Sequence, residues 1–131
     1  MVDALRAAHR VTRRGGIVID ARPDHSRRPR LIAGGRVRGH IHQSEDADAR
    51  DTRSDGAVRK VIALGLYRST GTRGVVWHRT RYSSLAEMDE YLSDSARYGG
   101  YERGTRQALI PFRRGPIDMR RAIKFELLER L

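Results

Sequence analysis

The sequence predicts an α/β fold, with a mixed sheet and flanking helices, in which residues 1–131 form a single domain. Two observations predict it. Near the amino terminus a helical pattern runs through Gly15-Gly16 directly into a short apolar segment. Further along the chain, apolar residues recur at the helical period in some segments and alternate as in strands in others. Such a succession of helices and strands is typical of α/β domains.

The amino-terminal segment contains the first predicted helix and strand. Asp3 is placed to cap the helix, and Gly15-Gly16 to end it. The apolar residues at helical spacing are Ala4, Leu5, Ala8 and Val11. The run Ile17-Val18-Ile19 is wholly apolar, which predicts a strand covered on both faces.

The residues after that strand form the first candidate site. Residues 21–29 contain two prolines and no periodicity, which predicts a loop at the carboxyl end of the strand. Ligands bind at that end in open α/β sheets, so Asp20, Arg22 and His25 are candidate ligand-facing residues. We favour the alternative in which Asp20 and Arg22 pair with each other.

A β-hairpin is predicted over residues 30–42, with Gly34-Gly35 as its turn. On its second arm Val37, Gly39 and Ile41 point to one side. The other side is a candidate polar sheet face, formed by Arg36, Arg38, His40 and His42.

Two helices are predicted in the middle of the chain. One covers residues 55–67, where five apolar or small residues share a face: Val58, Val61, Ile62, Gly65 and Leu66. Residues 44–54 fit either a loop or an early helical turn. The other helix runs from Leu85 to about Ala96, because Ser84-Leu85-Ala86-Glu87 is a capping box and Leu85, Met88 and Leu92 form an apolar stripe.

The remaining segments are predicted as follows. Residues 69–72 form a turn before a strand over Val75–Tyr82, in which Trp77 is half-buried. Residues 98–101 interrupt the helix, 105–110 fit a short helix, and 111–116 form a basic loop. The tail, 121–131, fits a strand or a helix, and we favour a strand.

The amino-terminal segment resembles a known sequence motif. It is similar to the "AL-x-E-x-x-RVLRPGG" segment before the fifth strand of class I S-adenosylmethionine-dependent methyltransferases. The residues that match are Ala4-Leu5, Arg10-Val11, Arg13 and Gly15-Gly16. Ala7, Thr12 and Arg14 stand where the family often has Glu, Leu and Pro. The later elements resemble the carboxy-terminal half of that Rossmann-like domain, whose sheet ends with an antiparallel strand.

The resemblance implies S-adenosylmethionine as cofactor, but the chain lacks the motif that holds it. The family binds it on a spaced glycine turn after the first strand. The glycine pairs 15–16, 34–35 and 99–100 do not have that spacing. We therefore expect a methyltransferase-like protein or subunit without independent cofactor binding or catalysis. A sheet cut at residues 17–19 has an apolar edge, so we also expect a homodimer or a partner chain.

Composition limits the other functional classes. The chain has no Cys, which excludes disulfides and thiolate chemistry. It has no apolar run near the roughly 20 residues of a membrane span and no signal-peptide core, so we expect a cytoplasmic protein that does not enter membranes. The net charge of +11 makes a basic nucleic-acid-binding module the alternative function. We rank it second because residues 44–95 have eight basic and nine acidic side chains.

Three further patterns in the sequence bear on a metal site, on hydrolase chemistry and on single-strand binding. His40 and His42 share a strand face, and His78 could join them, but no nearby side chain completes a metal shell, so no metal site is predicted. No G-x-S-x-G turn indicates a hydrolase. Five aromatic residues near arginines fit either a single-strand-binding face or core packing: Trp77, Tyr82, Tyr91, Tyr98 and Tyr101.

Overall fold

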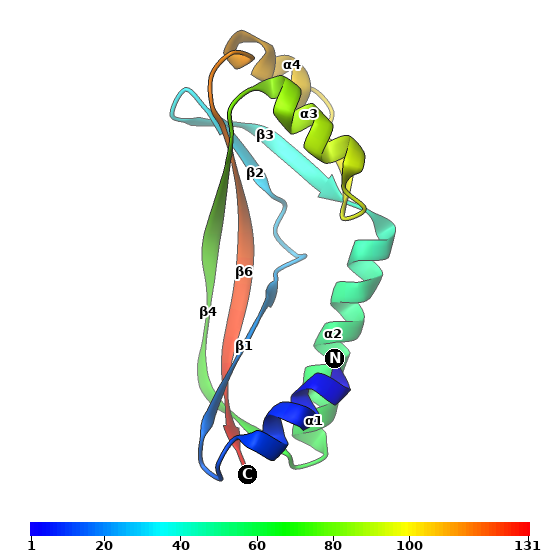
Figure 1. Ribbon diagram of the computed structural model, residues 1–131, viewed down its shortest axis with the longest axis vertical. Coiled ribbons are helices and arrows are strands. Elements are labelled where there is room, and N and C mark those ends of the chain that lie inside the picture. Colours follow the sequence, from blue (N-terminus) through cyan, green and yellow to red (C-terminus); the bar gives the residue numbers. More distant parts are fainter. The chain divides into compact units, whose positions relative to one another are not determined.

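The computed structural model describes residues 1–131 and has a mixed α/β composition (Figure 1). Four helices accompany a six-stranded sheet. The sheet is antiparallel, so the prediction of a mixed sheet is wrong. The reason is that β6 (Ile117–Arg130) pairs with both β1 (Ile17–Pro23) and β4 (Tyr67–Tyr82), and no crossover connection makes two neighbouring strands parallel. None of the helices combines the length and the apolar character needed to cross a membrane.

The chain divides into two compact units, each with its own hydrophobic core. The first unit comprises Met1–Pro23, Ala49–Val76 and Ile123–Leu131. The second comprises Asp24–Asp48 and Trp77–Ala122. Strands β4 and β6 and helix α2 (Glu45–Ala63) contribute residues to both units.

The core of the first unit lies between its helices and its strands. Helix α1 (Val2–Val11) lies beside the carboxy-terminal part of α2 (Figure 1). The buried residues of this core are Leu5, Val58, Val61, Tyr67 and Leu128.

Helix α1 is the helix predicted at the amino terminus. It differs from the prediction in two residues, because Asp3 lies inside its first turn and Val11, expected on the apolar stripe, is 86% exposed. The helix ends before Gly15, whose φ of 74° belongs to the turn that leads into β1.

Strand β1 differs from its prediction in length and in burial. It continues to Pro23, so Asp20 and Arg22 lie on the strand and not in a loop. Pairing with β6 explains the difference, because Asp20 is opposite Glu126 and Arg22 opposite Lys124. The strand is also not covered on both faces.

Helix α2 begins ten residues before the predicted start, at Glu45, and ends at Ala63. The Ser44 hydroxyl accepts a hydrogen bond from the Ala47 N–H at 3.2 Å, and acidic residues in the first turn favour a helix start here. Gly65, with φ 70°, prevents the helix from reaching Tyr67. Residues 44–54, for which a loop and an early helical turn were both predicted, are therefore mostly helical.

Strand β4 begins at Tyr67, so the turn predicted at residues 69–72 is wrong. The strand as a whole pairs with β6. The Ser69 hydroxyl also donates to the carboxylate of Glu126. The half-buried position of Trp77 is confirmed.

The second unit contains the predicted hairpin, formed by β2 (Arg30–Ala33) and β3 (Arg36–Gln43). Gly34 and Gly35 both have positive φ, 58° and 74°, as a tight hairpin turn requires. β2 also pairs with β6. β3 pairs with β5 (Tyr98–Tyr101), a strand where only a helix break was predicted.

Helices α3 (Leu85–Asp94) and α4 (Thr105–Leu109), with the short 3-10 helix η1 (Ile110–Phe112), complete the second unit. The predicted cap is confirmed, because Ser84 accepts the Glu87 N–H at 3.2 Å. The Glu87 carboxylate, however, accepts from Ser83 and not from Ser84. The stripe of Leu85, Met88 and Leu92 is buried as predicted, the short helix at 105 is present, and the tail is a strand.

Candidate functional site

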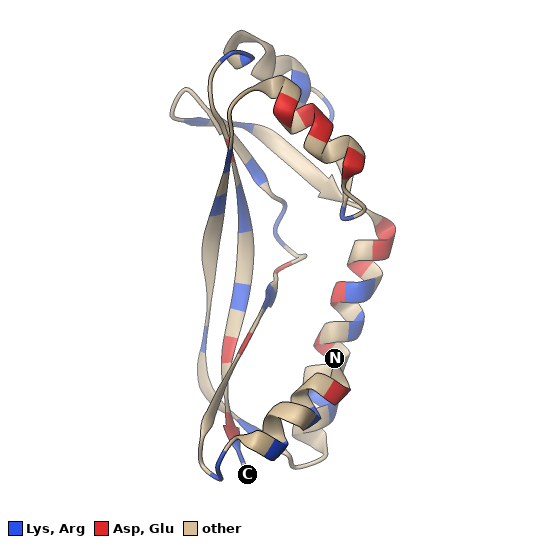
Figure 2. Cartoon of the chain, viewed as in Figure 1, with Lys and Arg blue, Asp and Glu red and all other residues tan.

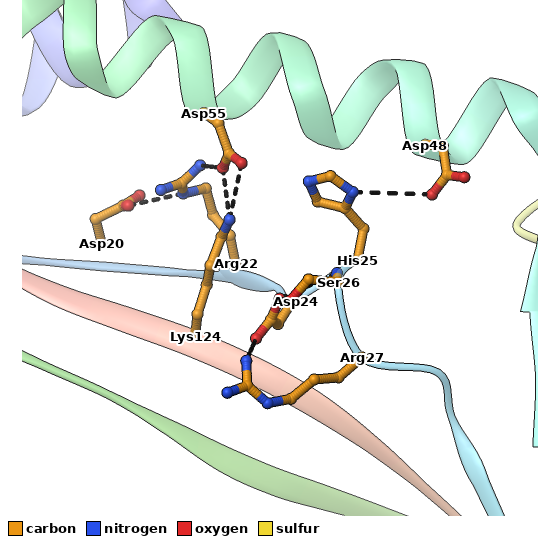
Figure 3. Close-up of polar contacts among 9 residues, drawn as sticks. All are labelled: Asp20, Arg22, Asp24, His25, Ser26, Arg27, Asp48, Asp55 and Lys124. Carbon is orange, nitrogen blue, oxygen red and sulfur yellow. Dashed lines mark hydrogen bonds and ion pairs between the residues drawn. The ribbon is translucent and has the colours of Figure 1, made fainter.

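Asp20 and Arg22, two of the predicted ligand-facing residues, belong to an ion-pair cluster in the first unit (Figure 3). Arg22 Nε lies 2.7 Å from Asp20 Oδ2, and the same guanidinium binds Asp55 of α2. Lys124 Nζ of β6 lies 2.7 Å from Asp55 Oδ1. Asp20 is 7% exposed. The local pair that we favoured is therefore present, within a network that joins α2 to the sheet.

His25, the third predicted residue, lies in the second unit beyond the end of β1. Its Nδ1 is 3.9 Å from Asp48 Oδ1 (Figure 3). Nearby, Asp24 accepts from the Ser26 N–H at 3.1 Å and from its hydroxyl at 2.6 Å, and it also binds Arg27. Burial opposes the charge on Asp24, but the hydrogen bonds from Ser26 and Arg27 outweigh it and lower the pKa of Asp24. These contacts shape a turn.

The four residues of the predicted polar sheet face have separate surroundings. Arg38 Nε donates to the Ala33 carbonyl at 2.8 Å, and its guanidinium lies 4.4 Å from the Phe112 ring centroid. The backbone N–H of His40 donates to Thr105 Oγ1 at 3.2 Å. The His42 ring lies against Gly99. Arg36 is exposed. No hydrogen bond or ion pair joins these four side chains.

The aromatic residues of the second unit are mostly core residues. Tyr82 and Tyr98 are 7% and 5% exposed, and Tyr91 packs between them. The Tyr101 hydroxyl donates a hydrogen bond to Asp89 at 2.7 Å. Burial is the largest cause that raises the pKa of Tyr101, and the hydrogen bond to Asp89 is the next. Arg30 lies over the Trp77 ring, 4.0 Å from its centroid. Core packing thus accounts for most of these rings.

The first unit has an open apolar sheet face. Val18 packs against the core, so its neighbours Ile17 and Ile19 point away from it, and they are 50% and 67% exposed. Their neighbours on β6 include Leu127, directly opposite Ile19, and Phe125. A Cβ at Gly74 of β4 would lie 3.0 Å from the Phe125 ring, which places Gly74 on this face as well.

The second unit has a cavity of about 800 Å³ that the sequence analysis did not identify. Four arginines line it: Arg79, Arg81, Arg114 and Arg120. Two pairs of its charged residues are spaced two apart on strands, Arg79 with Arg81 and Asp118 with Arg120. This spacing was the available signal, because residues two apart on a strand share a face.

No group of three or more His, Cys, Asp or Glu side chains is arranged to hold a metal ion. Comparison of the chain with protein-family models, curated proteins and solved structures gives no match in any of the three.

Proposed function

We propose that this chain is a methyltransferase-like protein or subunit that acts in the cytoplasm with another chain and is inactive alone. The order of elements in the first unit carries the proposal. α1 leads through Gly15-Gly16 into β1, α2 and β4 follow, and β6 pairs antiparallel with β1. A final antiparallel strand is what the resemblance to class I methyltransferases implies, so this order supports it.

The glycines support the absence of an independent S-adenosylmethionine site. The resemblance places the cofactor on a spaced glycine turn between a strand and a helix. No two glycines of this chain are spaced as G-x-G. Gly15 lies before a strand, and Gly34 and Gly35 form a hairpin turn. We infer that the chain alone does not hold the cofactor.

The edge of β1 supports association with a second copy of this chain. β1 pairs with β6 and with no other strand, so one row of its backbone groups is open. The apolar face beside this edge is almost neutral, because its charged residues Arg68 and Glu129 pair at 2.5 Å. In a chain of net charge +11, two copies meet with least repulsion at such a face.

The sequence of β1 is also self-complementary. If a second β1 runs antiparallel and is centred on Ala21, Asp20 of each chain lies opposite Arg22 of the other. Opposite charges across neighbouring strands are favourable. Such a two-fold contact uses the same residues in both chains, as is usual in homodimers.

Two measurements on the purified chain test the proposal. Light scattering at micromolar concentration should give the mass of a dimer. A stable monomer would overturn the self-association, and a dimer only in the presence of another protein would replace the second copy by that partner. Calorimetry with S-adenosylmethionine should show no binding, and micromolar binding would contradict the absence of a cofactor site.

The alternative function is a basic nucleic-acid-binding module, which the net charge of +11 favours. Figure 2 shows basic residues on elements of both units, interspersed with acidic ones on the helices. Of the hairpin residues that would bind phosphate, Arg38 is already engaged by the Ala33 carbonyl and Phe112. We therefore rank this function second.

A further inference from the structure

The cavity of the second unit has the size of a small-molecule site. Its volume of about 800 Å³ lies within the roughly 300–1,000 Å³ of ligand pockets. Its walls come from the β2–β3 hairpin, β4, β6 and the segment around η1. All of these residues belong to the second unit, so the cavity is complete within it.

The charge of the cavity is strongly positive. Its four arginines face a single acidic residue, Asp118, which leaves a surplus of three positive charges. Arg81 binds both carboxylate oxygens of Asp118, at 2.8 and 3.1 Å, and Arg79 lies 4.0 Å from it. Asp118 lies within ion-pair distance of Arg79 and Arg81, whereas Arg120 acts on it only through its charge, and Arg114 lines the cavity without a part in this cluster. The guanidinium groups of Arg114 and Arg120 are thus not held by a carboxylate at hydrogen-bond distance and can bind an anion.

Asp118 offsets one of the four positive charges and orients part of the rest. The hydrogen bond from Arg81 is the main cause that lowers the pKa of Asp118, so the carboxylate stays charged and keeps the Arg81 fork in one position. The side chains of Arg79 and Arg81 remain 58% and 57% exposed. Their remaining N–H groups are therefore accessible from solvent.

The cavity also has an apolar wall. Phe112 lines it, and Arg38 is stacked over the Phe112 ring at 4.4 Å. A Cβ at Gly34 would lie 2.6 Å from Phe112 Cε1, so the ring can occupy this position only because Gly34 has no side chain. Ile32 and the half-exposed Val37 complete this wall. Such a surface suits a planar or apolar part of a ligand.

We propose that the cavity binds a small phosphorylated molecule that has at least two phosphate groups and an aromatic or apolar part, as a nucleoside diphosphate has. Guanidinium groups bind phosphate oxygens through paired N–H donors. A surplus of three positive charges matches the charge of a diphosphate. A nucleic-acid strand would need a continuous groove, whereas these arginines line one cavity. This site does not depend on the proposed subunit function.

Calorimetry at low salt with three probes tests the site on the full chain. ADP should bind more tightly than pyrophosphate, because only ADP can use the Phe112 wall, and adenosine should not bind measurably. The variant Arg114→Gln/Arg120→Gln should bind ADP at least about tenfold more weakly, since each lost charged hydrogen bond lowers affinity by roughly that factor. Phe112→Leu should reduce the preference for ADP over pyrophosphate.

The matched control is Arg103→Gln, which removes one exposed arginine of the same unit that does not line the cavity. It should bind ADP as the wild type does, and thermal melting should show that all variants are folded. Failure of both ADP and pyrophosphate to bind at millimolar concentration would overturn the proposal. So would an equal loss in Arg103→Gln. A single-stranded oligonucleotide that binds when ADP does not would assign the cavity to nucleic acid instead.

Discussion

Ile19 and Leu127 lie directly opposite each other in the β1–β6 pairing, on the open face of the first unit. Side chains opposite each other on neighbouring strands stabilise a sheet by contact. Here the contact is incomplete, because Ile19 remains 67% exposed. Apolar groups that stay in contact with water beside an open strand edge favour association. This pair is therefore the place to test the proposed dimer.

We predict that Ile19→Lys converts the dimer into a monomer, because a charge replaces an apolar group at the contact and removes its burial. Light scattering measures the mass, and circular dichroism checks the fold. The control is Val11→Lys, which removes an apolar side chain that is 86% exposed on α1 and away from this face. A variant Ile19→Lys that remains dimeric would place the contact elsewhere.

A second prediction compares two buried tyrosines, one whose hydroxyl forms a hydrogen bond and one whose hydroxyl does not. Tyr67 is 1% exposed, and its hydroxyl donates to the Leu5 carbonyl at 2.8 Å. Tyr98 is 5% exposed, and its hydroxyl is buried without a hydrogen-bond partner. Tyr67→Phe should lower the free energy of unfolding by about 1 kcal/mol, a typical net value for one hydrogen bond.

Tyr98→Phe, in contrast, should leave the free energy of unfolding unchanged or raise it, because it removes a buried group that has no partner. Urea denaturation measures both variants. Equal destabilisation by the two substitutions would show that the Tyr98 hydroxyl has a partner, such as a bound water.

The sequence predicted best those elements whose signal is local. Ser84 caps α3, and Gly34-Gly35 turns the hairpin, because a short stretch of residues determines each of these structures. The prediction from the sequence failed where pairing with a strand distant in the sequence determines the structure of a segment. β1 continues to Pro23 and β4 begins at Tyr67 because both pair with β6, and Tyr98–Tyr101 becomes a strand because β3 is beside it.

The candidate sites were likewise predictable only where their contacts are local in the sequence. The pair of Asp20 with Arg22 was favoured from the sequence as a local contact, although Arg22 was expected in a loop; on β1 the two residues share a face because they lie two apart. Asp55 and Lys124, which complete that cluster, come from α2 and β6, and no local pattern brings them together. The cavity arginines likewise come from β4, β6 and a loop.

A third prediction concerns acid. The Arg81 hydrogen bond lowers the pKa of Asp118 below that of an ordinary aspartate, so the pair stabilises the folded state at any pH above the ordinary value of about 3.9. This contribution is lost as the pH falls through the lower pKa of the folded state. Arg81→Gln should raise the pKa of Asp118, which a carboxyl NMR titration measures, and should make unfolding less dependent on pH in this range. An unchanged Asp118 pKa would show that Arg81 does not bind it in solution.

The last prediction separates the proposed function from the nucleic-acid alternative. If the hairpin arginines form a phosphate surface, the logarithm of the affinity for duplex DNA should fall with the logarithm of the salt concentration, with a slope of about −0.9 for each phosphate neutralised. Arg36→Ala/Arg38→Ala should then flatten that slope. We expect the opposite, weak binding near physiological salt and little effect of the double substitution, because Arg38 is held by the Ala33 carbonyl and Phe112. Fluorescence anisotropy with duplex and single-stranded oligonucleotides over a salt series measures this. A steep slope that flattens in the double variant would favour the nucleic-acid function over the methyltransferase-like one.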